Sequence, residues 1–240
     1  MKEQKIAVLG CGLWGRNIVR NFYNLNALGM VCDLDDDNLA KVREQYPNVK
    51  TTKDFHDILN SDEITGVVVV TPSHTHFKFV KAMLEAGKHV YVEKPISTVA
   101  KEARDLTDLA DKKGLVLMVG HLLLYHPAVN RLKMLVEEGA LGDIVYAQSD
   151  RLNINYFKND RSVMWDLAPH DVSMISYALG KNPESVISAI GCSSDRNDIM
   201  DITHIGIKME GGAVAHITDS WMFVELRKLQ FWMILYLNIN

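Results

Sequence analysis

The chain has 240 residues, 48% of them apolar, which is enough to bury one large or two modest hydrophobic cores. Its 26 basic and 30 acidic residues give a formal net charge of −4, and this small acidic excess argues against nucleic acid or an anionic membrane as the main partner. Three cysteines without paired or metal-binding spacing, no signal-peptide pattern and no apolar run near the ~20 residues of a membrane helix predict a cytoplasmic protein.

The first predicted element is a short buried strand over residues 5–9, which runs directly into a glycine-rich turn and a helix. The glycines fall at G-x-G-x-x-G spacing, and a turn this tight needs residues without a Cβ. Backbone N–H groups at the start of the helix can then approach a pyrophosphate, and the helix dipole adds to the attraction. We therefore expect this loop to bind a dinucleotide through Gly10, Gly12, Leu13, Trp14 and Gly15.

A second predicted strand, over residues 29–32, ends at Asp33, about 20 residues after the glycine loop. The Asp33 carboxylate is suited to accept hydrogen bonds from ribose hydroxyls. The same carboxylate would repel a 2′-phosphate, and the next three residues, Leu34, Asp35 and Asp36, supply no cation to bind one. The sequence therefore predicts NAD as the cofactor in preference to NADP.

Strands and helices continue to alternate up to about residue 120. Strands are predicted over 66–71, 89–93 and 115–119, and helices over 36–45, 54–59, 75–85 and 97–113, the last capped by Ser97. The continuous run over 66–71 is typical of a strand buried on both faces of a parallel sheet. The pattern predicts an α/β fold with a Rossmann-type, doubly wound parallel sheet over residues 1–121.

The pattern changes after residue 121. Helices are predicted over 127–138 and 165–179, and strands over 143–152, 185–190, 202–209 and 213–219. The pair Gly211-Gly212 between the last two strands predicts a hairpin turn. Residues 122–240 are therefore expected to form a second, α+β domain with a mainly antiparallel open sheet.

Polar residues that directly follow the strands of the first domain are candidate site residues, because ligands of open parallel sheets bind beyond the carboxyl ends of the strands. They are Thr71 and Pro72 with His74 and His76, then Glu93, Lys94 and Pro95, and finally Gly120 and His121. In the second domain, Asp166 and His170 are four residues apart and share one face of a predicted helix.

These motifs resemble those of the Gfo/Idh/MocA family of sugar oxidoreductases. The resemblance extends from Lys5 to about Trp221 and rests on the glycine loop, Thr71-Pro72 with His76, the segment 86–95 ending in Glu93-Lys94-Pro95, and the segment 166–171. The stretches 14–17, 120–127 and 165–171 look like the branch acting on nucleotide-linked sugars, which includes UDP-N-acetylglucosamine 3-dehydrogenases. Family members are generally longer, so the second domain is expected to be incomplete or altered after Trp221.

The resemblance implies hydride transfer to NAD with three catalytic residues. Lys94 would polarise the substrate oxygen, His170 would take the hydroxyl proton, and Asp166 would orient His170 or hold a sugar hydroxyl. The family pattern further implies a cis peptide bond before Pro95, and no metal. It places Thr71, Pro72, His76, Glu93 and Lys94 at the cofactor, and His121, Tyr125, Trp165, Asp166 and His170 at the substrate.

Structural roles stay open for several of these side chains. His170 is also compatible with a hydrogen-bonded structural histidine, Asp166 with a helix cap, and Lys94 with a solvated surface lysine. His74 and His76 are equally compatible with caps at a helix start. A metal site is a further alternative, and its ligands would be Asp166, His170, Asp171 and His121. Their spacing is unlike that of zinc sites.

The leading functional hypothesis is an NAD-dependent oxidoreductase that oxidises a ring hydroxyl, at C3, of a nucleotide-linked sugar such as UDP-N-acetylglucosamine. The alternatives are an inositol or free-sugar dehydrogenase, an NADPH-dependent keto-sugar reductase, and a non-catalytic NAD-binding relative with a shortened second domain. The expected partners are the small sugar substrate and further copies of the chain, joined through the second-domain sheet. The apolar run over residues 231–237 is predicted to be a strand of that interface.

Overall fold

The computed structural model describes residues 5–152, 162–193 and 199–222. The chain divides into two compact units, Met1–Gly120 and His121–Asn240, one residue before the boundary expected from the sequence. Each unit has its own sheet and its own hydrophobic core. Within the described residues, no helix is long and apolar enough to cross a membrane.

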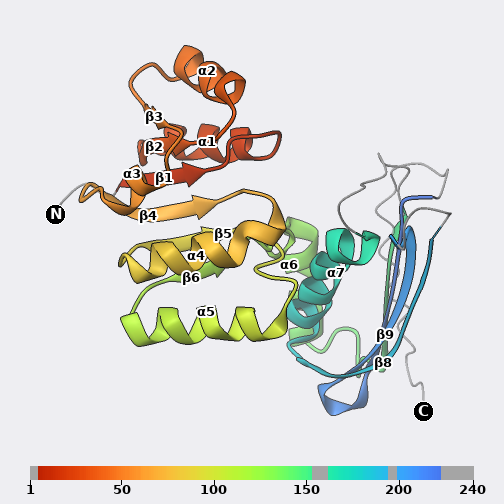
Figure 1. Cartoon of the computed structure of the whole chain (residues 1–240). Coiled ribbons are helices and arrows are strands. Elements are labelled where there is room, and N and C mark those ends of the chain that lie inside the picture. The colour runs from red at the N-terminus through yellow and green to blue at the C-terminus, as the bar shows by residue number, and fades with distance from the viewer. Residues whose placement is uncertain (1–4, 153–161, 194–198, 223–240) are drawn as a thin grey trace. The chain divides into compact units, whose positions relative to one another are not determined.

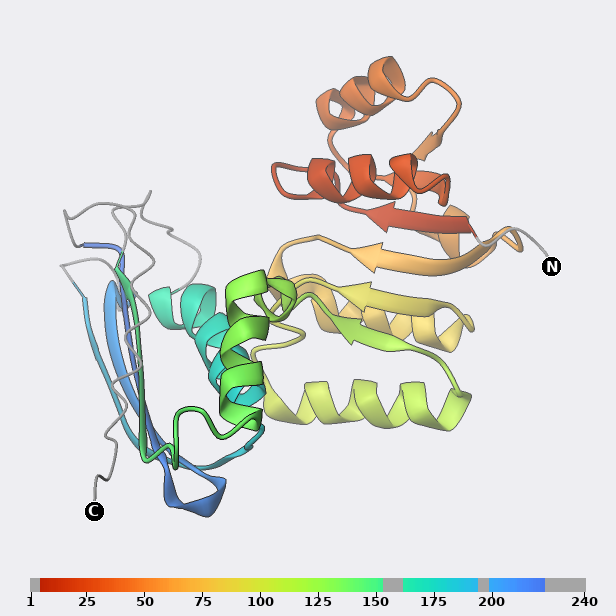
Figure 2. The ribbon, with the colours of Figure 1, turned by 180° about the vertical axis from the view of Figure 1, so that it is seen from behind.

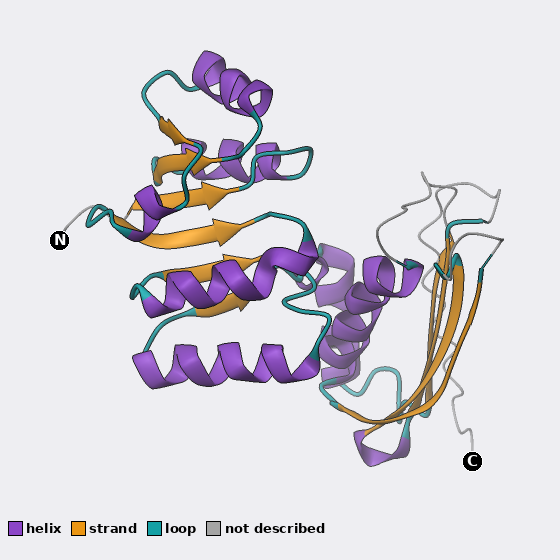
Figure 3. Ribbon diagram, viewed as in Figure 1, coloured by secondary structure: helices purple, strands orange, loops and turns teal. Residues whose placement is uncertain are grey.

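The first unit is built on a six-stranded parallel sheet in the order β3-β2-β1-β4-β5-β6. The chain starts in the middle of the sheet, steps outward to one edge and then returns to build the other half, so the sheet is doubly wound as predicted. Figure 3 shows its strands alternating with helices. The strands are β1 (Lys5–Leu9), β2 (Leu28–Cys32), β3 (Lys50–Thr52), β4 (Ile64–Val69), β5 (His89–Val92) and β6 (Leu117–Val119).

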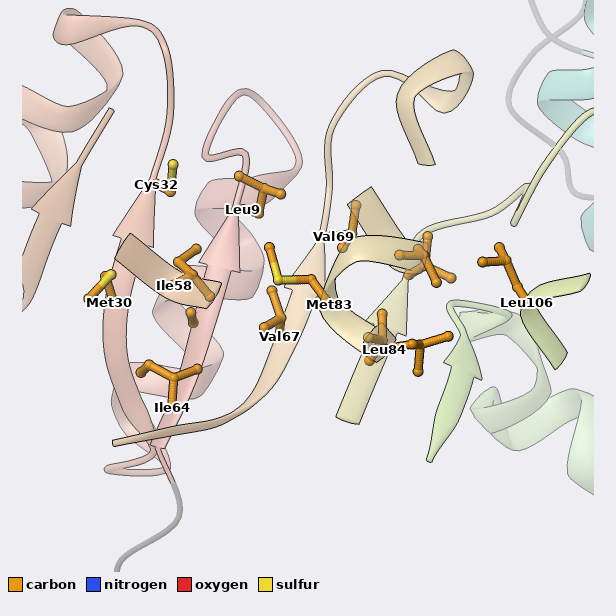
Figure 4. Packing of buried hydrophobic residues seen from close by; sticks show 14 of the residues in the cluster. Leu9, Met30, Cys32, Ile58, Ile64, Val67, Val69, Met83, Leu84 and Leu106 are labelled. Carbon is orange, nitrogen blue, oxygen red and sulfur yellow. The ribbon is translucent and has the colours of Figure 1, made fainter. Parts of the chain in front are cut away.

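Helices cover both faces of this sheet because its strands are apolar on both sides. The helices α1 (Gly15–Asn24) and α2 (Asp36–Gln45) contribute to one buried cluster, together with Val68 of β4. The helices α3 (His56–Leu59), α4 (His76–Glu85) and α5 (Ala100–Lys113) contribute to the other, together with Val67 and Val69 (Figure 4). Neighbouring valines of β4 thus point to opposite cores, which explains the unbroken apolar run.

The second unit has a four-stranded sheet in the order β7-β10-β9-β8. The β8–β9 and β9–β10 pairs are antiparallel and the β10–β7 pair is parallel, so the sheet is mainly antiparallel as predicted. Gly211 and Gly212 form the expected turn between β9 and β10, with φ angles of 77° and 88° that favour glycine. The strands are β7 (Tyr146–Leu152), β8 (Pro183–Cys192), β9 (Ile202–Met209) and β10 (Val214–Ser220).

Two helices of the second unit, α6 (Pro127–Glu137) and α7 (Val163–Leu179), lie on the same side of its sheet (Figures 1 and 2). Ala168, Ile175 and Leu179 of α7 pack into a buried cluster with residues of β9 and β10. The edge strand β8 is exposed along its whole length. Its apolar residues Val186, Ile187 and Ile190 are between 59% and 66% exposed.

Some expectations differ from the structure in detail. The strand β3 was not predicted, because its three residues are too few to show a periodic pattern. The helix expected from Ser97 begins at Ala100, since the Ser97 hydroxyl accepts the Val99 N–H in a turn that precedes the helix. Residues 122–125 form a 3-10 helix, η2, that was also not predicted. The strand predicted over 231–237 lies outside the described residues.

Candidate active site

The glycine loop begins where β1 ends, and a Cβ atom would have a different effect at each of its three glycines. Gly10 has a φ of 95°, and a Cβ built there would lie 2.8 Å from the Val70 carbonyl oxygen. At Gly15, which opens α1, a Cβ would lie 2.2 Å from the Gly10 carbonyl oxygen. At Gly12 a Cβ would meet nothing within 4 Å. Two glycines are therefore required by the fold itself, and the third leaves bare backbone that a ligand can approach.

Asp33 follows β2 and supports the glycine loop directly. Its Oδ2 accepts the Cys11 backbone N–H at 2.6 Å, and its Oδ1 accepts the Asp35 N–H at 2.9 Å. A cation that sequence reasoning missed also lies here: Arg16 of α1 donates from Nη2 to Asn38 Oδ1 at 3.1 Å. Asn38 Nδ2 is in turn 3.5 Å from Asp33 Oδ2. The residues after Asp33 supply no cation, but the first turn of α1 does.

Two buried thiols lie beside this carboxylate. Burial raises the pKa of Cys11 to about 12, and the Asp33 charge adds to the shift. Burial, again with Asp33, raises the pKa of Cys32 to about 12. Both cysteines are therefore protonated at neutral pH and fill space rather than act as nucleophiles.

A hydrogen bond joins the glycine loop to the end of β5. Trp14 Nε1 donates to Glu93 Oε1 at 2.9 Å, and Tyr91 Oη donates to the same oxygen at 3.2 Å. Gly120, which follows β6, makes room for this arrangement, because a Cβ there would lie 2.6 Å from Tyr91 Oη and 3.0 Å from Glu93 Oε1. Residues that follow β1, β5 and β6 thus converge on the Glu93 carboxylate.

His76 connects the turn after β4 with the turn after β5. Its ring is 1% exposed, and its nitrogens lie 2.8 Å from the Thr71 carbonyl oxygen and 2.7 Å from the Pro95 carbonyl oxygen. The Lys94–Pro95 peptide bond is cis, as the family resemblance implied. His76 therefore positions the backbone of the two turns that carry Thr71 and Lys94, from a buried place at the start of α4.

In the second unit, Asp166 and His170 lie one turn apart on α7, as their spacing predicted. Asp166 is buried and His170 is partly exposed. Pro169 lies inside the helix and has no N–H to donate to the carbonyl four residues earlier, so this turn lacks one intrahelical hydrogen bond. The other predicted substrate residues are at least partly exposed, on α7 and around η2: Trp165, His121 and Tyr125.

Asp171, next to His170 on α7, belongs to a buried cluster on the sheet. Arg151 of β7 binds the Asp171 carboxylate through Nε at 2.9 Å and Nη2 at 3.0 Å, and Ser149 Oγ donates to it at 2.6 Å. Asp219 of β10 pairs with Arg151 in the sheet register and is 0% exposed. Burial, followed by the Asp171 charge, raises the pKa of Asp219 to about 8, against the opposing effect of Arg151. The cluster holds α7 on the sheet one residue after His170.

A cavity of about 420 Å³ lies elsewhere in the second unit, among α6, β7 and α7. Its lining is mainly apolar and includes Leu132, Leu135 and Met174, but none of the predicted site residues. Within the described residues, no group of three His, Cys, Asp or Glu side chains is placed to hold a metal ion.

Comparison with known proteins identifies both units. Residues 4–121 match the oxidoreductase family with an NAD-binding Rossmann fold, and residues 129–234 match the C-terminal domain of Gfo/Idh/MocA proteins. The chain belongs to the Gfo/Idh/MocA family. The resemblance inferred from the motifs is therefore confirmed, and so is NAD as the cofactor class of the first unit. The open backbone at Gly12 and the placement of Asp33 fit that cofactor.

Several Gfo/Idh/MocA proteins are similar along most of this chain. A UDP-N-acetylglucosamine 3-dehydrogenase from Acidithiobacillus ferrooxidans is 27% identical, and the alignment covers 100% of this chain and 75% of that protein. Its solved structure superposes with a TM-score of 0.82 over 94% of this chain and 72% of that chain. A myo-inositol 2-dehydrogenase from Thermotoga maritima is 24% identical over 90% of this chain and 68% of that protein.

The fold is also shared with GenD2 from gentamicin A biosynthesis in complex with NAD, with a TM-score of 0.87 at 23% identity, covering 94% of this chain and 68% of that one. Other relatives are matched over a smaller part of their length, such as 52% of an uncharacterised oxidoreductase from Streptococcus pneumoniae. The chain thus spans about half to three quarters of the length of these Gfo/Idh/MocA relatives.

Sequence reasoning missed three charged residues near the predicted site: Arg16, Arg151 and Asp219. Arg151 and Asp219 occupy inward positions of β7 and β10, where the alternate pattern otherwise places small or apolar side chains such as Ala147, Ala215 and Ile217. Charged residues at inward strand positions were the available signal for this cluster. The roles of Lys94, Asp166 and His170 stay predictions.

Proposed function

We propose that this chain is part of an NAD-dependent oxidoreductase that oxidises a ring hydroxyl of a sugar, at C3 of a nucleotide-linked sugar such as UDP-N-acetylglucosamine. The observation that carries the proposal is the hydrogen bond between Trp14 and Glu93. The hydrogen bond fixes Glu93, the residue before Lys94, to the glycine loop. Glu93 follows β5, which lies in the half of the sheet opposite Asp33. This supports the proposal, because Lys94 directly follows an anchored residue, and we propose that its ammonium is the cation that a reacting hydroxyl needs.

Oxidation of a secondary alcohol removes a hydride from carbon and a proton from oxygen. NAD supplies the hydride acceptor when it is bound. The Lys94 ammonium would stabilise the negative charge that develops on the substrate oxygen, and the His170 imidazole would accept the hydroxyl proton. Asp166 lies one turn before His170, and its carboxylate would favour the imidazolium that results.

The nucleotide-linked substrate is supported by the similarity to a UDP-N-acetylglucosamine 3-dehydrogenase, which extends over the whole chain. The similarity to a myo-inositol 2-dehydrogenase supports a second candidate, a cyclic polyol substrate. Both substrates present a ring hydroxyl to the same proposed machinery. We also propose that copies of the chain associate through the second-unit sheet, because β8 is at the edge of the sheet formed by the described strands and its residues Val186, Ile187 and Ile190 are exposed.

The test is NADH formation by the purified chain with UDP-sugars, free sugars and inositols, each with NAD. We expect turnover with a UDP-sugar, and we expect Lys94→Ala and His170→Asn each to lower kcat by about 10²-fold or more. Lys101→Ala is the matched control, because Lys101 is an exposed lysine on α5, and its activity should equal that of the wild type.

Turnover with inositols alone would refute the nucleotide-sugar assignment and support the cyclic polyol. NAD binding without turnover of any substrate, together with no effect of Lys94→Ala on that binding, would instead indicate a non-catalytic relative.

A further inference from the structure

Trp14 presents a fixed aromatic ring and is about half exposed. The ring is fixed because its Nε1 donates to Glu93 Oε1 at 2.9 Å, and Glu93 is itself 8% exposed and held by Tyr91. The residue is nevertheless 46% exposed. Large aromatic surface that is both preorganised and open to solvent is typical of a ligand-binding face.

The sheet order places this ring in one half of the dinucleotide site. The glycine loop follows β1, Glu93 follows β5, and β4 lies between those two strands. The Trp14 side chain therefore spans the end of β4. Asp33 follows β2, on the other side of β1, where an adenosine ribose is bound in folds of this kind. A dinucleotide with its pyrophosphate on the glycine loop extends its second nucleoside towards Trp14.

The chemistry of that second nucleoside differs between the two redox states of the cofactor. The oxidised nicotinamide ring carries a positive charge, whereas the reduced ring is neutral. An indole face attracts cations more strongly than any other aromatic side chain, and the Glu93 carboxylate adjoins it. We propose that Trp14 is the residue on which the nicotinamide ring rests, and that it makes the chain select the oxidised cofactor over the reduced one. This inference rests on NAD binding by the first unit and is independent of the sugar substrate.

Calorimetric titration with NAD and with NADH tests the proposal. In Trp14→Leu, the affinity for NAD should fall about tenfold, while the affinity for NADH should fall no more than about twofold. Trp14→Phe keeps a weaker aromatic face, so its ratio of the two affinities should lie between those of the wild type and Trp14→Leu. Equal weakening of both cofactors, or no weakening of either, would overturn the proposal.

A spectroscopic readout separates ring contact from general loop damage. An indole stacked on the electron-poor oxidised ring should give a charge-transfer absorbance in the NAD complex of the wild type that is absent with NADH and absent in Trp14→Leu. Glu93→Gln keeps an acceptor oxygen for the indole N–H and should retain the band. Glu93→Leu removes that acceptor and should lose the band, so a band that persists in Glu93→Leu would refute the anchoring role of Glu93.

Tyr23→Leu is the matched control, because Tyr23 is a partly exposed aromatic residue of α1 whose ring contacts Tyr46 rather than the glycine loop. Neither cofactor affinity should change in this variant. If Trp14→Leu does not fold, as judged by circular dichroism, the conservative Trp14→Phe carries the test. No readout here uses substrate turnover, so failure of this inference is distinguishable from failure of the proposed reaction.

Discussion

Replacing Asp219 with asparagine should make the protein more stable at alkaline pH. Asp219 is 0% exposed and lies beside Asp171, whose carboxylate is already paired with Arg151. Within the part of the chain that the structure describes, a second ionised carboxylate in this cluster would have to share Arg151 with Asp171. Asparagine has nearly the same shape, cannot ionise, and offers an amide N–H to Asp171 where protonated Asp219 offers its O–H. The variant therefore imitates the protonated wild type at every pH.

The size of the effect follows from the pKa of Asp219, which burial and Asp171 raise from 3.8 to about 8. A raised pKa means that the folded protein keeps a proton that the unfolded chain releases, so the associated stability is complete below the unfolded pKa and is lost as the pH rises towards the folded one. Each pH unit in that window lowers the free energy of unfolding by about 1.4 kcal/mol. Between about pH 5 and pH 8, the wild type should therefore lose about 4 kcal/mol of stability relative to Asp219→Asn.

Thermal and urea unfolding of both proteins, measured at intervals between about pH 5 and pH 9, tests this prediction. For a chain of this size, 4 kcal/mol corresponds to a difference in Tm of about 10 °C. The advantage of the variant should grow steadily up to about pH 8 and then level off. Asp143→Asn removes an exposed carboxylate of the same unit and should run parallel to the wild type. A constant difference between Asp219→Asn and the wild type would refute the reasoning.

Three further predictions concern the cofactor loop, cofactor choice and assembly. Gly15→Ala should lose both stability and NAD binding, because its Cβ meets the Gly10 carbonyl oxygen. Gly12→Ala should keep the Tm of the wild type and lose NAD affinity alone, because its Cβ meets no neighbouring atom among the described residues. Equal Tm values for the two variants would contradict this prediction. Asp33→Asn should raise the affinity for NADP relative to NAD about tenfold or more in equilibrium titrations. Adding Arg16→Leu to this variant should remove the gain, because Arg16 supplies the cation that would bind the 2′-phosphate. Sedimentation should show an oligomer that dissociates when residues 230–240 are deleted; a monomeric wild type with unchanged Tm after the deletion would refute the proposed interface.

Local signals in the sequence were sufficient for the fold and the cofactor loop. The G-x-G-x-x-G spacing, the unbroken run in β4 and the acidic residue after β2 each follow from short-range constraints: backbone that must bend without a Cβ, strands buried on both faces, and a carboxylate at a strand end. The placement of Asp166 and His170 one turn apart on α7 was predictable for the same reason, because helical spacing is local. Among the described elements, β3 and the 3-10 helix η2 were too short to leave a readable pattern.

The tertiary structure decided which distant side chains meet. Trp14 and Glu93 are joined only because β4 is the one strand between β1 and β5, and Arg151, Asp171 and Asp219 meet only because β7 pairs with β10 beneath α7. No periodicity along the chain encodes such pairings, since they depend on strand order and register. The raised pKa of Asp219 depends on these pairings, because burial and the neighbouring Asp171 carboxylate each raise it, and the tertiary structure supplies both.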